Sequence, residues 1–500
     1  MHCPVCGHGL GLATPHDPKQ KVKCPARGCG VELKASEEGW LTHSLQLEKN
    51  YSILVLPFGM KDDYASTVHK LTRSKRWKQR TFLADNPQDA ERTGYFLPYI
   101  RRFLFPSLYN EASDTTSAHF EFDLAGNLSA TGLEIFGELA QQDKDNVKFS
   151  EYAEISRTTL RLFPFGVGFL LIRVEMSQDE TFFGQMAAVS HLRLLEPLFL
   201  GHTLPQIRMG EETFTTPQLV RYFLDEFARK PARPASPGSA AAGASWPIKL
   251  IYDDRMLTYT FSCIDANAAA EDGRQVERWL YRETPFKIDT ERLDPNNTNR
   301  RAWIFKRWEA YSKDGAALIA FDSSDFHRDY LGLYFGTYYF DIFLLACLQR
   351  ITLLLQFETL SDIPSLTGKG GHSRKRIQEI QRDLLHFKNQ CWFSQITNRE
   401  KGLDVWRRWQ GVFETEKLLQ EVNEQSNELN TFLQNRSRER VEWMIRAGAF
   451  LAATVPLLLA LDESFTDAPW VHQVKTWGLV ALITGVGIFG LIRTVKQGKS

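Results

Sequence analysis

Two apolar stretches near the C-terminal end decide the fold: AGAFLAATVPLLLAL at residues 447–461 and TWGLVALITGVGIFGLI at residues 476–492. Each is slightly shorter than the roughly 20 residues that a membrane-spanning helix needs. The apolar character continues beyond Arg446 on one side and Arg493 on the other. Both helices therefore reach full length if these arginines direct their charges toward the membrane surface. The pattern predicts two membrane-spanning helices joined by a short loop.

Charged residues around these stretches are sorted by position. Basic side chains occupy both outer flanks: Arg436, Arg438, Arg440, Arg446, Arg493, Lys496 and Lys499. The loop at residues 462–475 is acidic, with Asp462, Glu463 and Asp467 against a single lysine. Because basic flanks stay in the cytoplasm, we expect a multi-pass protein of the cell inner (plasma) membrane with both termini cytoplasmic. A buried helical hairpin in a soluble core is the alternative, but it gains nothing from sorted charges.

The composition bounds the remainder of the chain. Its 500 residues contain 60 Lys and Arg against 60 Asp and Glu, and the formal net charge is zero. A neutral chain carries no overall field that favours nucleic acid, so we predict no specific nucleic-acid partner. The first residues lack the basic and apolar regions of a signal peptide. We therefore expect a cytosolic N-terminal portion that the C-terminal helices anchor in the lipid bilayer.

Four cysteines near the N-terminus form two pairs. Cys3 and Cys6 belong to the turn CPVCG, and Cys24 and Cys29 belong to CPARGCG. Each pair lies in a Pro/Gly turn that directs two thiolates toward one centre, and four thiolates complete a tetrahedral zinc site. Disulfides are disfavoured in the reducing cytosol. We predict a structural zinc ribbon over residues 1–45, whose closed coordination leaves no position for catalysis.

Residues 50–325 alternate between strand-like and helix-like patterns. Strands are predicted at Tyr51–Phe58, Ser117–Leu124, Ile248–Tyr252, Met256–Ile264 and Ala316–Phe321, and two more around a turn within Thr159–Met176. Pro217–Lys230 has a helical pattern, whereas residues 230–247 are rich in Ala, Pro, Gly and Ser and are expected to be a disordered loop. The basic segment His69–Arg80 is interpreted as a solvated helix face, with binding of phosphates or anionic lipid as the alternative. This mixture predicts a cytosolic α/β (α+β) domain.

The pattern from residue 326 to residue 440 is helical. Leu331–Phe357 is apolar enough to suggest a further membrane span, but Asp341, Gln349 and Arg350 interrupt it. We interpret this segment as a buried cytosolic helix, with a membrane segment as the alternative.

A heptad pattern precedes the first apolar stretch. Apolar or semi-polar residues recur at alternating steps of four and three: Leu418, Val422, Gln425, Leu429 and Phe432. This spacing is typical of a coiled-coil seam with one polar layer. Because no proline interrupts the chain there, one helix over residues 404–461 is predicted, and a helix of that length is expected to be a stalk that assembles with copies of itself. Antiparallel pairing with Ser373–Phe393 in the same subunit is the alternative.

This order of elements resembles the CorA-type divalent-cation transporters. In that family a cytosolic α/β domain precedes a long stalk helix, which runs into the first span and is followed by a short outer loop, a second span and a basic tail. The resemblance covers about residues 50–500 as an order of elements and residues 418–499 in more detail. It implies a homo-oligomer, a pentamer in that family, whose first span lines the pore, and a transported ion such as Mg²⁺ or another divalent cation. The family's Gly-Met-Asn signature is replaced here by Leu461-Asp462-Glu463, so its selectivity residues are not carried over.

The first span and the outer loop supply candidate pore residues under this resemblance. Phe450 and Leu457 would form apolar gate rings, and Thr454 is the hydroxyl residue inside that span. Asp462 and Glu463 would form an acidic ring at the outer mouth. An acidic mouth favours cations that enter from outside.

Two further features bear on transport and its regulation. A ring of Arg446 near the inner mouth opposes cations unless Glu442, one turn earlier, neutralises it. The family binds regulatory divalent ions at cytosolic carboxylates, which makes Asp322, Asp325 and Asp329 candidate regulatory ligands. Helix capping is the alternative explanation for these three residues.

Two classes of function follow from these patterns. The chain contains no motif of a known catalytic site, so we expect no enzymatic activity. One hypothesis is a homo-oligomeric ion channel or transporter that is gated from its cytosolic domain. The other is a membrane-anchored sensor or effector, in which the C-terminal hairpin only tethers and oligomerises the protein.

Overall fold

A computed structural model describes most of the chain between residues 47 and 460. The described residues are 21–23, 32–36, 39–42, 47–109, 119–125, 131–139, 147–177, 182–197, 203–227, 246–264, 300–303, 307–320, 324–362 and 370–460. Several predicted features lie outside them, namely the zinc cysteines Cys3, Cys6, Cys24 and Cys29, residues 230–245, Asp322, the loop carboxylates Asp462 and Glu463, and the second apolar stretch. Those predictions remain predictions.

The chain divides into two compact units. The first contains residues up to Thr352 together with Phe393–Thr415, and the second contains Leu353–Trp392 together with Glu416–Ser500. A small antiparallel sheet near the N-terminus consists of β1 (Lys21–Lys23), β2 (Glu32–Ser36) and β3 (Gly39–Thr42), and β1 ends at the residue before Cys24.

The first unit is built on a 13-stranded sheet, which confirms the mixed α/β class. Its main path runs β11 (Glu212–Thr215), β10 (Gln206–Met209), β7 (Thr131–Leu139), β8 (Val147–Phe163), β9 (Val167–Glu175), β4 (Leu47–Gly59), β13 (Leu257–Ile264), β16 (Gly315–Ala320), β15 (Arg307–Ser312) and β14 (Arg300–Trp303). Three short strands lie off this path: β12 (Lys249–Leu250) on β4, and β5 (Trp77–Gln79) on β6 (Phe120–Leu124), which itself pairs with β8. Within this sheet β13 and β16 are parallel, and the other described pairs are antiparallel.

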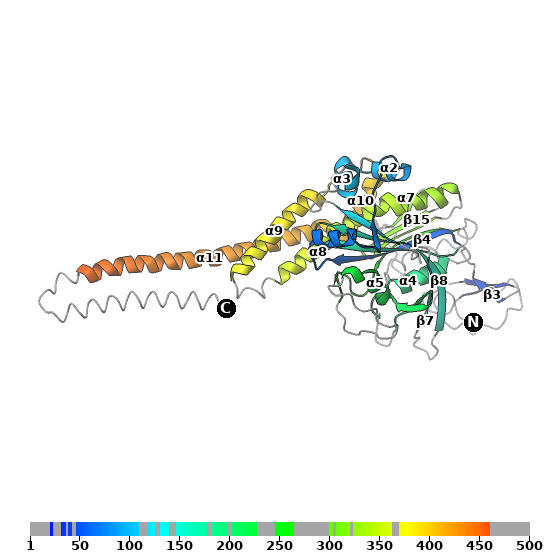
Figure 1. Cartoon of the computed structure of the whole chain (residues 1–500), viewed down its shortest axis with the longest axis horizontal. Helices are drawn as coiled ribbons and strands as arrows, with labels where there is room; N and C mark the ends of the chain where they lie inside the picture. Colours follow the sequence, from blue (N-terminus) through cyan, green and yellow to red (C-terminus); the bar gives the residue numbers. More distant parts are fainter. Residues whose placement is uncertain are drawn as a thin grey trace. The chain divides into compact units, whose positions relative to one another are not determined.

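The two faces of the sheet carry different helices, as Figure 1 shows. One face packs on α1 (Tyr64–Thr72), α4 (Phe182–Leu192) and α5 (Thr216–Phe223) through apolar residues such as Leu160 and Leu162 of β8. On the other face lie α2 (Pro87–Gly94), α3 (Pro98–Leu104) and α10 (Glu400–Phe413). Because side chains alternate along a strand, Thr159 and Arg161 of β8 point to this second face. Short 3₁₀ turns at Pro106–Tyr109 and Asp225–Phe227 complete the unit.

A continuous helical run crosses the second face of the sheet. It comprises the π-helical turns η5 (Phe326–Leu331) and η6 (Phe335–Tyr339), the short α7 (Gly332–Tyr334) between them, and α8 (Phe340–Ser361). Two glycines allow the close approach, because a Cβ on Gly332 would lie 2.8 Å from the Phe261 ring and one on Gly336 would lie 2.7 Å from Tyr51 Oη. Tyr51 Oη also donates a hydrogen bond to the Gly332 carbonyl at 2.7 Å.

The run Phe326–Ser361 is long and apolar enough to cross a membrane by length and composition, and it is the one such helix among the described residues. However, 72% of its most apolar window is buried inside the protein. The helix therefore owes its apolar composition to packing, as the buried-helix interpretation of Leu331–Phe357 predicted.

The predicted single helix over residues 404–461 is wrong at one point. Helix α10 ends at Phe413, Glu414 adopts a left-handed conformation with φ 52°, and a new helix α11 runs from Thr415 to Ala460. The break has a tertiary cause. Trp409 and Phe413 are fully buried, with ring centroids 4.7 Å and 6.3 Å from that of Phe343 in α8, so α10 is held on the sheet unit.

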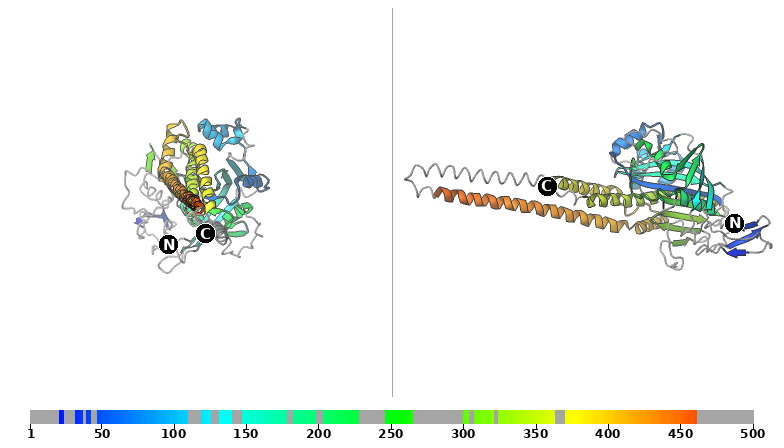
Figure 2. Two further views of the ribbon diagram at one scale, coloured as in Figure 1. Left: turned by 90° about the vertical axis from the view of Figure 1, so that its left-hand side faces the viewer. Right: turned by 90° about the horizontal axis from the view of Figure 1, so that it is seen from below.

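The second unit contains the long helix α11, which Figure 2 shows as one continuous rod. Its 46 residues span roughly 69 Å at about 1.5 Å per residue. Helix α9 (Gly370–Cys391) buries Ile377, Ile380, Leu384 and Phe387, again at steps of three and four. Lys388 Nζ of α9 donates a hydrogen bond of 2.7 Å to Asn423 Oδ1 of α11. The pairing with Ser373–Phe393 that the sequence left open is thus present in the single chain.

The basic segment His69–Arg80 is not one solvated helix face, as its charges had suggested. Helix α1 ends at Thr72, and Trp77–Gln79 forms strand β5, in which the Trp77 side chain is buried. Buried Trp77 recruits the segment to the sheet edge, and this places Arg80 at the site described next.

A candidate ligand-binding cavity lined by arginines

The sheet unit contains a cavity of about 260 Å³ on the second face of the sheet. Its floor is formed by residues of β4, β6, β8 and β9, and its walls by α2 and by the run from α7 to the start of α8. Five arginines line it: Arg80, Arg92, Arg157, Arg161 and Arg173. Three carboxylates share the lining, Asp89, Glu91 and Glu121. The lining side chains therefore carry more positive than negative charge.

Strand periodicity explains why the cavity is polar. Arg157, Thr159 and Arg161 line the cavity, whereas the alternating residues Leu160 and Leu162 enter the apolar core on the opposite face. Glu121 on β6 faces Arg161 across the strand pair, in which the two residues are register partners. A polar face on a central strand must find partners, because an unpaired buried charge is very costly.

Asp341 is the deepest carboxylate of this region. It lies in the first turn of α8 and is fully buried. Arg92 binds it in a bidentate manner, with Nε to Oδ2 and Nη2 to Oδ1 both at 2.6 Å. Arg161 Nη1 donates to the same Oδ1 at 2.6 Å. Two guanidinium groups from α2 and β8 thus hold the beginning of α8 against the sheet.

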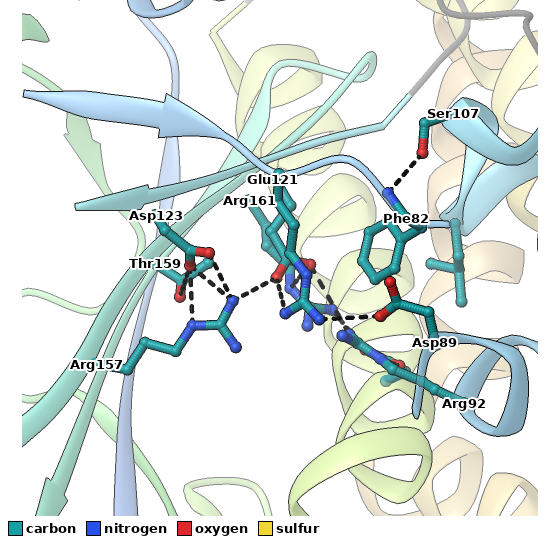
Figure 3. A network of polar contacts seen from close by, with 12 residues as sticks. Phe82, Asp89, Arg92, Ser107, Glu121, Asp123, Arg157, Thr159 and Arg161 are labelled. Carbon is teal, nitrogen blue, oxygen red and sulfur yellow. Dashed lines mark hydrogen bonds and ion pairs between the residues drawn. The ribbon is translucent and has the colours of Figure 1, made fainter. Parts of the chain in front are cut away.

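Glu121 is the second centre of the network (Figure 3). Its Oε1 accepts from Arg80 Nη1 and from Arg157 Nη2, each at 3.3 Å. Its Oε2 lies 3.2 Å from Arg161 Nε and 3.8 Å from Arg92 Nη2, without hydrogen-bond geometry. Burial alone would raise the pKa of Glu121, but these arginines, led by Arg161 and Arg92, hold the pKa well below its usual range. Glu121 is therefore ionised at physiological pH.

The pKa of Asp341 shifts in the same direction. Burial would raise it, but the charges and hydrogen bonds of Arg92 and Arg161 outweigh burial and lower the pKa. Conversely, burial opposes the charge of Arg92, but Asp341 and Glu121 raise its pKa above the usual value. The buried groups therefore remain fully charged and hold one another in fixed positions.

Carboxylates outside the cavity hold Arg157 and Arg173 in position. Arg157 forms hydrogen bonds with Asp123 through Nε at 2.9 Å and Nη2 at 2.7 Å, as Figure 3 shows. Arg173 Nε donates to Glu175 at 2.8 Å, and its guanidinium carbon lies 4.0 Å from the centroid of the Tyr51 ring. Neither Asp123 nor Glu175 lines the cavity. Their carboxylates orient guanidinium groups that face the cavity.

An aromatic wall stands opposite the arginines. Tyr334 and Tyr338 line the cavity from η6 and its preceding turn, and their ring centroids are 5.2 Å apart. Tyr338 stacks on Tyr95 at 3.9 Å with an interplanar angle of 11°. Leu333 at the rim exposes 47% of its surface. The cavity thus offers a cationic floor and a planar apolar wall.

His119 lies beside the network without lining the cavity. Its ring stacks on Phe163 with centroids 4.5 Å apart, and its Nδ1 is 2.8 Å from the Leu104 carbonyl oxygen. Burial, assisted by the positive charge of Arg161, lowers the pKa of His119 to about 4. His119 is therefore neutral at physiological pH, and Nδ1 is the donor to Leu104.

The sequence-predicted site residues are not part of this cavity. Asp325 and Asp329 each pair with Arg328, at 2.8 Å and 2.9 Å, and Asp329 also pairs with Lys49. The hydrogen bond from Arg328 lowers the pKa of Asp329. In the described part of the chain no three His, Cys, Asp or Glu residues gather as metal ligands. The gate candidates Phe450, Thr454 and Leu457 lie in α11, but their side chains are outside the described residues.

The arginine cavity itself was missed by sequence reasoning. Its key pairs are far apart in the chain, since 249 residues separate Arg92 from Asp341 and 180 separate Arg161 from Asp341. Two local signals were available. Arg157 and Arg161 occupy one face of a strand flanked by apolar residues, and Asp341 interrupts an otherwise apolar helix. Both signals indicate a buried charge that requires a partner, but neither identifies it.

Comparisons with protein-family models, curated proteins and solved structures find no match to this chain.

Proposed function

We propose that the protein is a homo-oligomeric, CorA-like membrane channel or transporter for divalent cations, gated from its cytosolic sheet unit. The observation that carries this proposal is the exposure of apolar side chains on most of the circumference of α11 as it approaches the first apolar stretch. Val441, Trp443, Met444 and Ile445 expose 47%, 44%, 58% and 65% of their surfaces. At about 100° per residue these positions cover roughly 200° of the helix circumference, and the charged pair Glu442 and Arg446 occupies the remaining side.

Such a helix segment favours an apolar environment over most of its circumference. Isolated exposed apolar residues are ordinary, but a contiguous exposed group marks a site of protein or membrane contact. Trp443 stands where the stalk meets the first apolar stretch, and aromatic residues are enriched at membrane interfaces. Arg446 pairs with Glu442 at 3.5 Å within the helix, so a ring of Arg446 would be partly neutralised at the inner mouth.

The remaining parts of the proposal follow the resemblance. The second apolar stretch would be the second span, the loop with Asp462 and Glu463 the outer mouth, and Phe450 and Leu457 the gate. The four N-terminal cysteines would hold structural zinc in a ribbon added to the pattern. Gln425 keeps one layer of the predicted seam polar, which favours a defined register over maximal stability.

Cation flux into proteoliposomes tests this function. The full-length protein should form one class of oligomer in particle images and should pass Mg²⁺ or Co²⁺ down a gradient. The Asp462→Asn, Glu463→Gln double variant should reduce the flux several-fold, because the acidic ring concentrates cations at the mouth. Asp383→Asn, an exposed position on α9 that belongs to no candidate site, is the matched control. A stable oligomer that passes no ion under any gradient would overturn the proposal.

The alternative is a membrane-anchored sensor or effector, and the arginine cavity specifically favours it. The cavity is complete within the sheet unit and does not involve residues of the predicted spans. Replacement of residues 447–500 by an unrelated two-helix anchor distinguishes the two functions. A sensor keeps its cellular activity after this exchange, whereas a channel loses it.

A further inference from the structure

Several N–H donors of the cavity arginines are not used in their internal hydrogen bonds. The bonds to Asp341 use Nε and Nη2 of Arg92 and Nη1 of Arg161. Arg92 Nη1 and Arg161 Nη2 have no hydrogen-bond partner among the described residues. Neither is one of the fully buried side-chain nitrogen atoms that lack a partner. The same holds for Arg157 Nη1 and for both Nη atoms of Arg173. Four arginines of the cavity lining therefore keep donors that their internal hydrogen bonds do not use.

These donors are already oriented before any ligand arrives. Asp341, Asp123 and Glu175 fix the guanidinium planes from behind, as described above. Binding therefore costs little side-chain conformational entropy. A group that is held in place in advance binds more tightly for the same contacts. Arg is also the side chain best suited to oxyanions, because its planar fork donates two parallel hydrogen bonds.

We propose that this cavity is a binding site for a small organic phosphate. A tetrahedral phosphate presents several acceptor oxygens, which suits guanidinium groups that converge from β8, β9 and α2. The planar organic part of the ligand packs on the wall of Tyr334, Tyr338 and Leu333. A volume of about 260 Å³ holds a phosphorylated sugar or a mononucleotide and excludes a nucleic-acid strand.

The site also has a route to the second unit, and this step rests on the proposed function. Asp341 occupies the first turn of α8, and residues of the same helix from Leu353 onward belong to the second unit. A phosphate bound through the remaining donors of Arg92 and Arg161 adds a second anion to the two guanidinium groups that hold Asp341. Its binding therefore changes the strength with which they hold the beginning of α8, which changes the ion flux of the channel.

Titration calorimetry of the full-length protein in detergent tests the binding site directly. The probes are adenosine monophosphate, ribose 5-phosphate, pyrophosphate and adenosine. We expect each phosphate compound that binds to saturate at one molecule per chain. We expect no saturable binding of adenosine. Arg157→Gln and Arg173→Gln should each weaken binding about 10-fold or more, because each removes a charged hydrogen bond. These two arginines are partly exposed, at 42% and 33% of their side chains. Arg157→Gln removes one of the two hydrogen bonds to Glu121 Oε1, whereas Arg173→Gln leaves the pairs of Glu121 and Asp341 intact.

Arg208→Gln is the matched control. Arg208 is also a strand arginine that pairs with a glutamate, Glu134, and lies over an aromatic ring, that of Phe136, but it is outside this cavity. Its replacement should leave the affinity unchanged. Thermal melting checks that all three variants are folded, and the ligand should raise the melting temperature of the wild type.

Three results would overturn the proposal: no saturable binding of any phosphate probe at millimolar concentration, equal affinity in the Arg157 and Arg173 variants and the wild type, or binding of adenosine as tight as that of adenosine monophosphate. Flux measurements separate this proposal from the channel function. Binding that depends on these arginines in a protein without flux refutes the channel alone, and flux without binding refutes the site alone.

Discussion

Two helices of this protein place apolar residues in opposite surroundings. Helix α8 is covered by the sheet and by α10, and the charge in its first turn, Asp341, is held by Arg92 and Arg161. Helix α11 carries four apolar residues between Val441 and Ile445 that are exposed among the described residues. The apolar composition of the first helix is explained by its neighbours within the sheet unit. The exposed apolar residues of the second are the observation behind the proposed contact with a membrane or with other copies.

The comparison teaches that hydropathy alone does not locate a membrane span. A buried charge that has partners marks a core helix, because the protein must supply what the solvent would have supplied. An apolar surface without partners marks an interface. Each of the following predictions changes one side of this comparison.

The largest effect is expected at Asp341. Asp341→Ala leaves Arg92 and Arg161 buried with an uncompensated charge, so the free energy of unfolding of the sheet unit should fall by about 3–5 kcal/mol. The measurement is urea unfolding of the full-length protein in detergent, followed by tryptophan fluorescence. Asp325→Ala is the control, since 82% of its side chain is exposed, and it should change stability by no more than about 0.5 kcal/mol. Equal losses in the two variants would refute the buried clamp.

A smaller effect is expected from the pH dependence of His119. Its pKa in the folded protein, about 4, is lower than the ordinary value of 6.5, so the unfolded chain binds the extra proton between these values. Stability should therefore fall as the pH decreases through this window, by about 2 kcal/mol between pH 7 and pH 5. The carboxylates with lowered pKa values, Glu121 and Asp341, lose their contribution only at still lower pH.

The variant His119→Gln isolates this contribution. Glutamine can still donate to the Leu104 carbonyl but does not titrate, so the loss of stability between pH 7 and pH 5 should shrink. An unchanged pH profile of the unfolding midpoint in the variant would show that His119 is not the group responsible.

Features that are set by neighbouring residues in the chain could be predicted from the sequence. Features that are set by residues far apart in the chain could not. The hairpin of β8 and β9, strand β13 and the buried helix α8 follow from local patterns, and these were predicted. The cavity depends on pairs such as Arg92 with Asp341, which the fold brings together from opposite ends of the unit. The break at Glu414 carries no Gly or Pro signal and results from the packing of Trp409 and Phe413 on Phe343. Local propensity contains none of this information.

The break between α10 and α11 provides a third, smaller prediction. Glu414 adopts φ 52°, a conformation that is strained for any residue other than glycine. It also stands at the end of a helix, where glycine is preferred. Its ion pair with Lys313 is half exposed on both sides and contributes little. Glu414→Gly should therefore stabilise the protein by about 0.5–1 kcal/mol. Destabilisation of that size in the same unfolding experiment would show that the ion pair outweighs the backbone strain.

The smallest effect on folding is expected at the exposed apolar residues of α11. Ile445→Gln on α11 should change the free energy of unfolding of the sheet unit by no more than about 0.5 kcal/mol, because 65% of the residue is already exposed. Leu344→Gln on α8 is the matched substitution, and it buries an amide without partners, so it should cost several kcal/mol or prevent folding. Under the proposed function, Trp443→Gln together with Ile445→Gln should reduce cross-linking between subunits or retention in membranes after high-salt washing, because these residues are proposed to meet lipid or neighbouring copies. If both remain unchanged while the folded monomer is also unaffected, the exposed apolar segment has no partner, and the difference between the two helices does not reflect an interface.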